Sequence, residues 1–249
     1  MRVHIAIPEP TSGDREYNQR SLPAYLAALE AAGAAPVVIA LDERPEHVAK
    51  LLARTAGILL PGSRFDIDPQ VYGEERISEC GPPDPGRMAV DEMLLQDAFN
   101  LRKPILAICG GAQALNVWRN GTLVQDLKTA VNHQPGRDVQ QAHRVHVVPG
   151  SRLAAAVPQD EPGDPWVNSS HHQAVRLLGD NLVASAVSGE DEVVEAIELN
   201  SREHFVVGVQ WHPERTYSTS AFSRRVFADW VRAAEQFEPR RIEESVAEK

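Results

Sequence analysis

The sequence is poor in cysteine, has no long apolar run and carries fewer basic than acidic residues. Only Cys80 and Cys109 occur among 249 residues, which excludes a disulfide framework and favours a reducing compartment. No window approaches the ~20 apolar residues of a membrane helix, and the first residues show no secretory apolar region. The formal net charge of −10 disfavours a nucleic-acid partner. A cytoplasmic protein is therefore expected, with no membrane and no nucleic acid as partner.

The close spacings typical of metal ligands, such as CxxC and HExxH, are also missing. The sequence on its own therefore predicts no metal site and no cofactor. His133, His143 and His146 lie in or near strand-like segments. We assign these three histidines structural or solvent-facing roles.

Strand and helix signals alternate through the first half of the chain. Short apolar strands are expected at residues 3–7, 36–41, 57–60 and 104–108, and helices at 21–33, 45–54, 88–101 and 111–118. Such alternation predicts a parallel sheet covered by helices on both faces. Residues 65–85 show no period and are expected to form a long loop of the kind that often carries function.

The second half is richer in strands. Segments 143–148, 182–187, 193–199 and 205–210 are strand-like, and they either extend the sheet or form a small antiparallel flap. Residues 220–237 predict a closing amphipathic helix. No repeat or linker divides the chain, so we expect a single domain over residues 1–238 followed by a polar tail, 239–249.

The first chemical signal is the segment ILAICGGAQ around Cys109. An apolar strand ends at this cysteine, a helix begins directly after it, and the residues two positions away, Ala107 and Gly111, are small. This is the pattern of a nucleophile elbow, in which a strained turn exposes the nucleophile. A thiol at a helix N-terminus is also favoured as thiolate. On this segment alone, a merely buried, structural cysteine is an equal alternative.

A second signal is VVGVQWHPE, where a strand ends in His212-Pro213-Glu214. Proline favours an extended conformation for His212, which would place Glu214 on the same side as the imidazole. Cys109, His212 and Glu214 then form a nucleophile, base and orienting acid at the ends of two strands. An imidazolium beside the thiol would depress the thiol pKa.

Two weaker signals concern the surroundings of Cys109. The turn at Gly62-Ser63 follows an apolar strand, and the Ser63 N–H could join that of Gly110 as an oxyanion hole. The segment VNSSHHQ is either a polar loop that caps a helix or an edge that recognises substrate.

Together these segments resemble the class I glutamine amidotransferase superfamily, and within it the γ-glutamyl-γ-aminobutyrate hydrolase branch. The similar motifs are LLPGSRFDIDPQVYG, PILAICGGAQALNVWRNGTLVQDL, VNSSHHQ and VVGVQWHPE. The resemblance implies an α/β flavodoxin-like three-layer sandwich, with a mostly parallel central sheet and a small antiparallel extension. It also implies a Cys-His-Glu triad and a homodimer.

The resemblance adds substrate-binding roles for particular positions. Gln113 matches the glutamine in the helix after the elbow, Gly62 the turn of the oxyanion hole, and the segment Ser170, His171, His172 and Gln173 the part that holds the glutamyl head. Four positions depart from the family pattern. Ala107 and Gly110 replace a glycine and an arginine around the cysteine. Ser63 replaces the second glycine of the turn, where a positive φ would strain a serine, and Asn120 replaces the first of two glycines after the helix, where asparagine also tolerates left-handed geometry.

The expected activity is hydrolysis of a small γ-glutamylated amine, such as γ-glutamyl-GABA in polyamine catabolism, through a thioester on Cys109. Two alternatives stay open: a glutaminase subunit that passes ammonia to a separate synthase, and a catalytically silent sensor of γ-glutamyl ligands. Glutamate release by the protein alone distinguishes the first alternative, and the reactivity of Cys109 the second.

Overall fold

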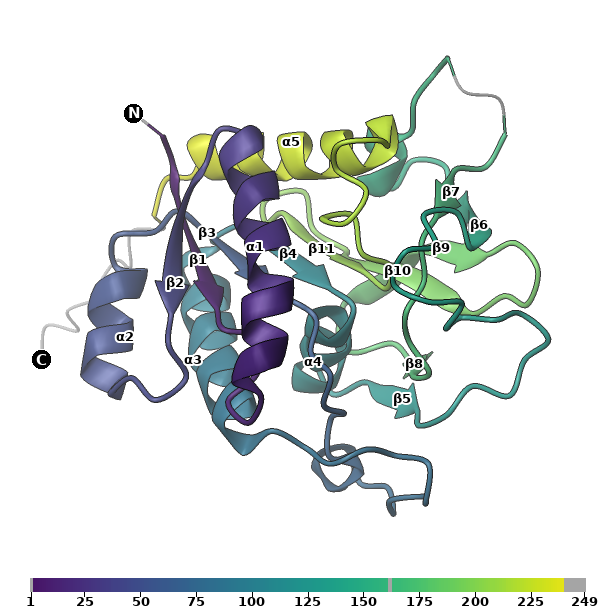
Figure 1. Ribbon diagram of the computed structural model, residues 1–249. Helices are drawn as coiled ribbons and strands as arrows, with labels where there is room; N and C mark the ends of the chain where they lie inside the picture. The colour runs from purple at the N-terminus through teal and green to yellow at the C-terminus, as the bar shows by residue number, and fades with distance from the viewer. Residues whose placement is uncertain (1, 161–162, 240–249) are drawn as a thin grey trace, which may run out of the picture.

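The computed structural model describes residues 2–160 and 163–239, and the expected tail lies almost wholly outside them. The first half alternates as the sequence predicts (Figure 1). Its elements are β1 (His4–Pro8), α1 (Arg15–Ala31), β2 (Ala35–Ile39), α2 (Pro45–Leu52), β3 (Gly57–Leu60), a 3₁₀ turn η1 (Pro69–Tyr72), α3 (Pro85–Leu101), β4 (Ile105–Ile108) and α4 (Gly110–Trp118).

The second half is mainly strands. It comprises β5 (Thr122–Val124), β6 (His143–Val147), a 3₁₀ turn η2 (Leu153–Ala156), β7 (Trp166–Val167), β8 (Ala174–Leu177), β9 (Leu182–Ser188), β10 (Val194–Leu199), β11 (Val206–Val209) and α5 (Ala221–Glu235). None of the helices in the described residues is long and apolar enough to cross a membrane.

The sheet joins a parallel and an antiparallel part. Strands β2, β1, β3, β4 and β11 run parallel in that order, and β10, β9, β6 and β7 continue the sheet with antiparallel pairing. The short strands β5 and β8 pair with each other, and β8 also pairs with β10. Of the two arrangements left open for the second half, the extended sheet is correct, and the α/β flavodoxin-like prediction is confirmed.

Helices cover both faces of the sheet and bury two apolar clusters (Figure 1). On one face α1 and α5 contribute Leu29 and Trp230, which are both fully buried. On the other face α2, α3 and α4 contribute Val48, Leu94 and Leu115. This three-layer arrangement leaves the carboxyl ends of β3, β4 and β11 side by side, where parallel α/β sheets form their sites.

Local chemistry explains where the elements depart from the expected bounds. Helix α1 begins six residues before the expected start, because the Asp14 side chain accepts a hydrogen bond from the Tyr17 N–H and caps the helix. Asp84 caps α3 in the same way through the Arg87 N–H, which places that helix start at Pro85. Strands β5, β7 and β8, with two to four residues each, were not predicted.

Candidate active site

Cys109 lies in a strained turn between β4 and α4. Its φ of 52° and ψ of −113° are unusual for a residue with a side chain, and its N–H donates to Val209 O of β11 at 2.7 Å. A Cβ atom on Gly111 would lie 2.3 Å from the Leu60 carbonyl oxygen, so this position accepts only glycine. Ala107 is fully buried within β4. The strand–turn–helix geometry expected of a nucleophile elbow is therefore present.

His212 and Glu214 make a close, buried pair just after β11. His212 Nδ1 lies 2.8 Å from Glu214 Oε1, and the two side chains are each 2% exposed. Residues 213–215 form a turn, so Glu214 reaches the ring by a reversal of the chain and not by the extended geometry expected from Pro213. Because Nδ1 faces a carboxylate, it carries the ring proton, and Nε2 is left with the lone pair.

The guanidinium of Arg215 lies against His212 Nε2 and is placed to donate a hydrogen bond to that lone pair. Its Nη2 atom lies 3.2 Å from His212 Nε2, and its Nε lies 3.5 Å from Glu214 Oε1. Arg215 was not predicted as a site residue, although it directly follows the His-Pro-Glu motif. The nitrogen that would act as a base is therefore covered by a cation.

The Gly62-Ser63 turn lies against both Cys109 and His212. A Cβ atom built on Gly62 would lie 3.0 Å from His212 Cε1 and 3.3 Å from Cys109 Cβ. A Cβ atom on Gly110 would lie 3.1 Å from the Ser63 N atom. Ser63 does not appear among the described residues with a positive φ, so the strain considered for a serine here does not arise.

Buried arginine and tyrosine side chains hold this turn in place. Arg87, 4% exposed, donates to Pro61 O at 2.6 Å and pairs with Asp91 at 2.7 Å. The hydroxyl of Tyr25 accepts from the Gly62 N–H at 3.0 Å and lies 3.4 Å from His212 Nδ1. Tyr25 was not predicted, because its helical spacing identifies it only as a core residue.

Asn168 and two glutamines connect the remaining segments. Asn168 Oδ1 accepts from the His212 N–H, and its Nδ2 donates to His212 O, both at 2.7 Å. Gln210 Nε2 lies 3.6 Å from Cys109 Sγ, and its Oε1 accepts from Gln113 Nε2 at 3.1 Å. Gln113 also donates to the backbone carbonyl of Gln173 at 2.9 Å. The Gln113 amide therefore links Gln210, beside Cys109, to the backbone of the HHQ segment.

The other positions of the HHQ segment differ in what their side chains do. Ser170 and His172 line the cavity described below, and His172 is held between Asp66 and Asp126 at 3.2 Å each. Asp66 raises the pKa of His172. Both ring nitrogens of His171 face protein groups, and the Gln173 side chain donates to Gln125 O. The ring of His171 and the amide nitrogen of Gln173 are therefore engaged within the protein.

Burial controls the ionisation of the three central groups. It raises the pKa of the Cys109 thiol to about 12, against the opposing effects of Arg215 and the Gly110 N–H. It also lowers the pKa of His212, against the attraction of Glu214. Burial works to raise the pKa of Glu214 as well, but His212 and Arg215 hold it below its usual value. Both shifts disagree with the expected thiolate–imidazolium pair and favour a neutral thiol and a neutral imidazole in the free site.

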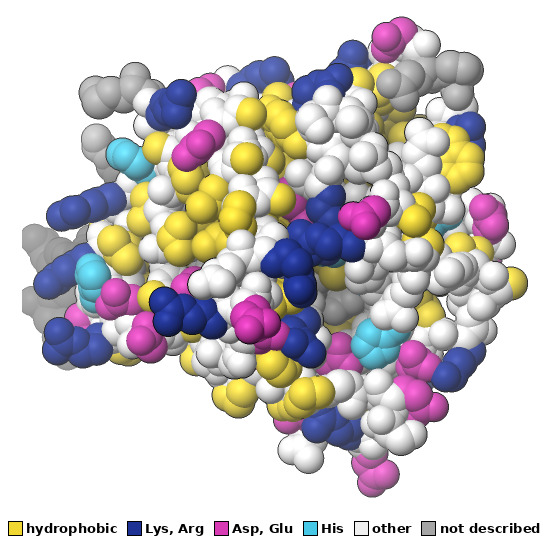
Figure 2. All heavy atoms as spheres, in the orientation of Figure 1, with side chains coloured by type: hydrophobic (Ala, Val, Ile, Leu, Met, Phe, Trp, Pro, Cys, Tyr) yellow, Lys and Arg dark blue, Asp and Glu magenta, His cyan; other side chains and the backbone are white. Residues whose placement is uncertain are grey.

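A cavity of about 520 Å³ opens over Cys109 and His212. Its lining includes four arginines, Arg20, Arg64, Arg137 and Arg215, although the protein as a whole is acidic. Figure 2 shows Lys and Arg side chains gathered around a hollow near the middle of the visible face. Such a lining attracts anionic ligands.

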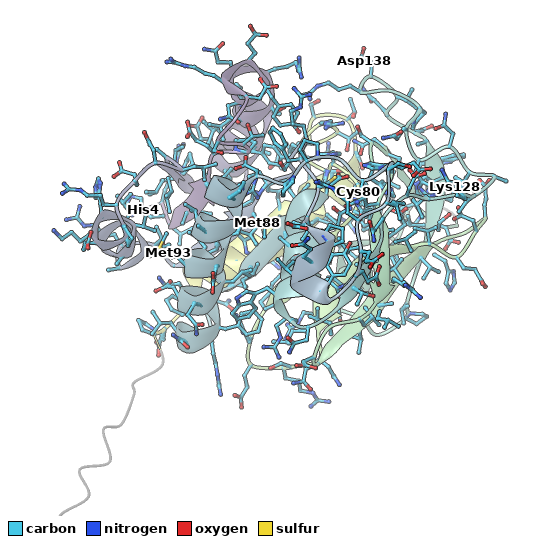
Figure 3. All side chains as sticks on the ribbon, turned by 90° about the horizontal axis from the view of Figure 1, so that it is seen from below. His4, Cys80, Met88, Met93, Lys128 and Asp138 are labelled. Carbon is cyan, nitrogen blue, oxygen red and sulfur yellow. The ribbon has the colours of Figure 1, made fainter. Side chains whose placement is uncertain are left out.

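Cys80 does not share these features. It lies in the loop before α3, and Figure 3 shows it between Met88 and Lys128 in the view from below. Its sulfur is 3.6 Å from Gln173 Nε2, and burial raises its pKa. Cys80 does not line the cavity, in agreement with an incidental thiol.

Comparison with known families agrees with this geometry. The model of the peptidase C26 family matches residues 6–214. The chain belongs to the peptidase C26 family. The γ-glutamyl-γ-aminobutyrate hydrolase PuuD of Escherichia coli is 36% identical over 222 residues, which cover 85% of each chain. The glutamine amidotransferase-like protein YvdE of Lactococcus lactis is 36% identical over 196 residues, 77% of this chain and 79% of that one.

Solved structures support the fold independently. The structure of PurLQS from Thermotoga maritima matches 93% of this chain and 99% of its own, with a TM-score of 0.61 and 17% identity. At that identity the likeness concerns the fold alone.

Proposed function

We propose that this protein is a cysteine hydrolase that cleaves the γ-glutamyl amide bond of a small, anionic γ-glutamylated amine. One observation carries the proposal: Cys109 in its strained turn shares a cavity with His212, whose ring Glu214 holds at 2.8 Å. Membership of the peptidase C26 family and the similarity to a γ-glutamyl-γ-aminobutyrate hydrolase support a hydrolase of this kind.

In the proposed reaction, Cys109 Sγ attacks the γ-carbonyl carbon while His212 Nε2 takes the thiol proton. The Ser63 and Gly110 N–H groups stabilise the oxyanion, and each such donor typically contributes about 3 kcal/mol to transition-state stabilisation. The imidazolium then donates its proton to the departing amine, which leaves a γ-glutamyl thioester. A water molecule, deprotonated by His212, hydrolyses this thioester to glutamate and restores the thiol.

The position of Arg215 couples substrate binding to the availability of the proposed base, His212. Because its guanidinium covers His212 Nε2 in the free site, it must move before the base can accept a proton. A substrate carboxylate that pairs with Arg215 supplies the reason to move, since an ion pair replaces a hydrogen bond to a neutral ring. We therefore expect anionic substrates to activate the base that acts on them.

The distal half of the substrate is proposed to lie against Arg20 and Arg137. Their recorded partners in the described residues are neutral: Arg20 lies over the Tyr17 ring, and Arg137 donates to Ser21 Oγ and Arg20 O. Arg64, in contrast, pairs with Asp14. These guanidinium groups offer the cation that Gly110, in place of an arginine, does not provide.

A matched substrate panel tests the proposal. Purified protein is given γ-glutamyl-γ-aminobutyrate, γ-glutamyl-butylamine and glutamine, and glutamate release is measured. In γ-glutamyl-butylamine a methyl group replaces the distal carboxylate. We expect the anionic amide to have the highest kcat/KM and glutamine the lowest. Equal rates with the two γ-glutamyl amines would overturn the anionic preference. Turnover of glutamine only after addition of a partner synthase would favour the glutaminase alternative, and no turnover of any amide would favour the sensor.

The cytoplasmic location, the homodimer and the role in polyamine catabolism stay predictions. The catalytic roles of Cys109, His212 and Glu214 are likewise proposals. The experiments below address these roles directly.

A further inference from the structure

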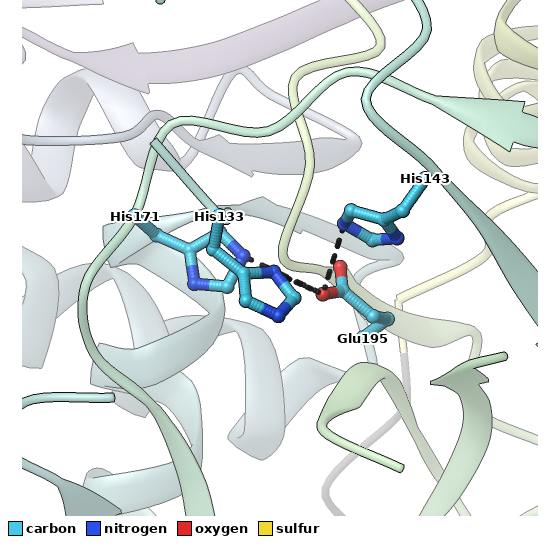
Figure 4. Close-up of side chains that lie close together, drawn as sticks. All are labelled: His133, His143, His171 and Glu195. Atoms are coloured by element: carbon cyan, nitrogen blue, oxygen red, sulfur yellow. Dashed lines mark ion pairs between the residues drawn. The ribbon is translucent and has the colours of Figure 1, made fainter. Parts of the chain in front are cut away.

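A second cluster of ionisable side chains lies beside the candidate active site. Figure 4 shows three imidazoles converging on one carboxylate: His133 from the loop after β5, His143 at the start of β6, His171 from the loop before β8, and Glu195 on β10. All four side chains are at most 2% exposed. A buried carboxylate surrounded by histidines requires a neutralising partner at the centre.

The distances fit a metal-ligand set. Glu195 Oε1 lies 3.3 Å from His133 Nδ1, 3.4 Å from His143 Nε2 and 3.4 Å from His171 Nε2. In a tetrahedral zinc site with bonds of about 2.0–2.1 Å, neighbouring ligand atoms are about 3.3–3.4 Å apart. One potential ligand atom from each residue lies within 4.8 Å of all the others. The widest pairs would close by up to about 1.4 Å on binding an ion of this size.

The remaining ring nitrogens set the histidine tautomers. His133 Nε2 lies 3.0 Å from Asp191 Oδ2, and His171 Nδ1 lies 2.9 Å from the Gln173 carbonyl oxygen. His143 Nδ1 lies 3.3 Å from the Arg144 carbonyl oxygen. Acceptors at these positions draw the ring protons outward, and such partners accompany most metal-bound histidines.

The inward atoms have no hydrogen-bond partner in the described residues. His133 Nδ1, His143 Nε2, His171 Nε2 and both oxygens of Glu195 are buried and unsatisfied. If every ring proton points outward, three lone pairs and a carboxylate face one another, which is repulsive without a cation. Imidazole nitrogens with a single carboxylate are a donor set that suits Zn²⁺.

We propose that His133, His143, His171 and Glu195 form a structural zinc site. Four protein ligands complete a tetrahedral coordination and leave no position for water or substrate, which is typical of structural rather than catalytic zinc. The ion would fasten the loop around residue 133 and the HHQ segment to β10. The same two segments are already joined where Ser169 Oγ and the His171 N–H both bond to His133 O.

The competing occupant of the centre is a proton. One protonated imidazole would also neutralise Glu195, and the ligand atoms would then share a hydrogen bond instead of a metal ion. The two alternatives differ in metal content and spectrum, and neither depends on the activity proposed for Cys109.

Metal analysis of the full-length protein decides between them. The protein is produced in medium supplemented with Zn²⁺, desalted, and analysed for zinc per chain by mass spectrometry. We expect about one zinc per chain. We also expect a melting temperature at least about 5 °C above that of protein made without zinc. Protein that contains no zinc after this treatment, and melts at the same temperature with and without it, would overturn the proposal.

Variants locate the ion. Glu195→Gln and His143→Ala are expected to lose the zinc, whereas His146→Ala, a matched control on the same strand with an exposed side chain, is expected to keep it. Equal zinc loss in the control would contradict the site. If the two cluster variants fail to fold, Co²⁺ substitution in the wild-type protein provides the test. An intense visible absorption typical of tetrahedral Co²⁺ is expected, and a weak octahedral spectrum would rule the site out.

Discussion

The protein contains two buried histidine–carboxylate arrangements of opposite design. At the candidate active site one carboxylate, Glu214, holds one imidazole, that of His212, which lines a cavity and whose Nε2 lies 3.2 Å from Arg215 Nη2. In the cluster, one carboxylate, Glu195, faces three imidazoles whose inward nitrogens meet no other protein group in the described residues. The first arrangement has one ring lone pair, which can take a proton once Arg215 moves, whereas the second points several ring lone pairs toward one centre. One imidazole per carboxylate therefore suits the proposed base, His212, whereas three imidazoles around Glu195 suit the proposed zinc site.

The two arrangements also differ in how the chain builds them. His212 and Glu214 are two residues apart, so a local turn brings them together. The cluster draws on four separate segments of the antiparallel half, which only tertiary structure assembles. Variants can therefore disable either arrangement separately, and each prediction below uses one region as the control for the other.

Removal of the nucleophile is expected to have the largest effect. Cys109→Ala should lower kcat/KM for γ-glutamyl-γ-aminobutyrate by at least about 10⁴-fold, because no other group can form the thioester. Zinc content and melting temperature should stay unchanged. Cys80→Ala is the matched control and should retain full activity. Wild-type turnover by Cys109→Ala, measured as glutamate release, would exclude the proposed mechanism.

Glu214→Gln is expected to have the next largest effect, about 10³-fold on kcat, because the amide holds the ring less well and does not stabilise its cation. The pH profile adds a sharper test. The base must be neutral, and burial lowers the pKa of His212, so wild-type kcat/KM should fall only below pH 6.5 as His212 becomes protonated.

Loss of the Glu214 charge removes an interaction that raises the His212 pKa, so in Glu214→Gln this acid limb should move to still lower pH. A limb that moves to higher pH, or does not move, would show that His212 and Glu214 do not act as a pair. Zinc content should not change, because this pair is separate from the cluster.

Arg137→Gln is expected to have the smallest effect, a rise in KM of about two- to fivefold, which is the size of one solvent-exposed ion pair. The rise should occur with γ-glutamyl-γ-aminobutyrate and be absent with γ-glutamyl-butylamine, which provides the control within one variant. Equal changes with both substrates would assign Arg137 a structural role.

The sequence predicted the parallel half of the fold and the strand–turn–helix geometry at Cys109 because their signals are local. Apolar runs ended by glycine or proline marked β3 and β4, and the small residues beside Cys109 indicated the tight turn. Asn120, expected to tolerate left-handed geometry, has a φ of 70°. Such features depend on residues adjacent in the chain.

What the sequence could not predict depends on burial or on distant contacts. The raised pKa of Cys109 follows from the depth of the site, which no motif encodes. Arg215 was overlooked because an arginine after a motif is usually a surface residue. The zinc ligands share no recognisable spacing, and His133 and His143 read as ordinary strand and loop histidines until the structure brought them to Glu195.

Asn168 gives the molecule a mechanical link that its chain order hides. The Asn168 side chain bonds to both the N–H and the carbonyl of His212, as a neighbouring strand would. These two bonds tie the loop at residue 168 to the segment that carries the base. Two residues 44 positions apart in the chain are thereby fastened to each other. A compound that wedges the loop at residue 168 away from the sheet would misalign His212 without ever entering the cavity, and would inhibit the enzyme from outside its site.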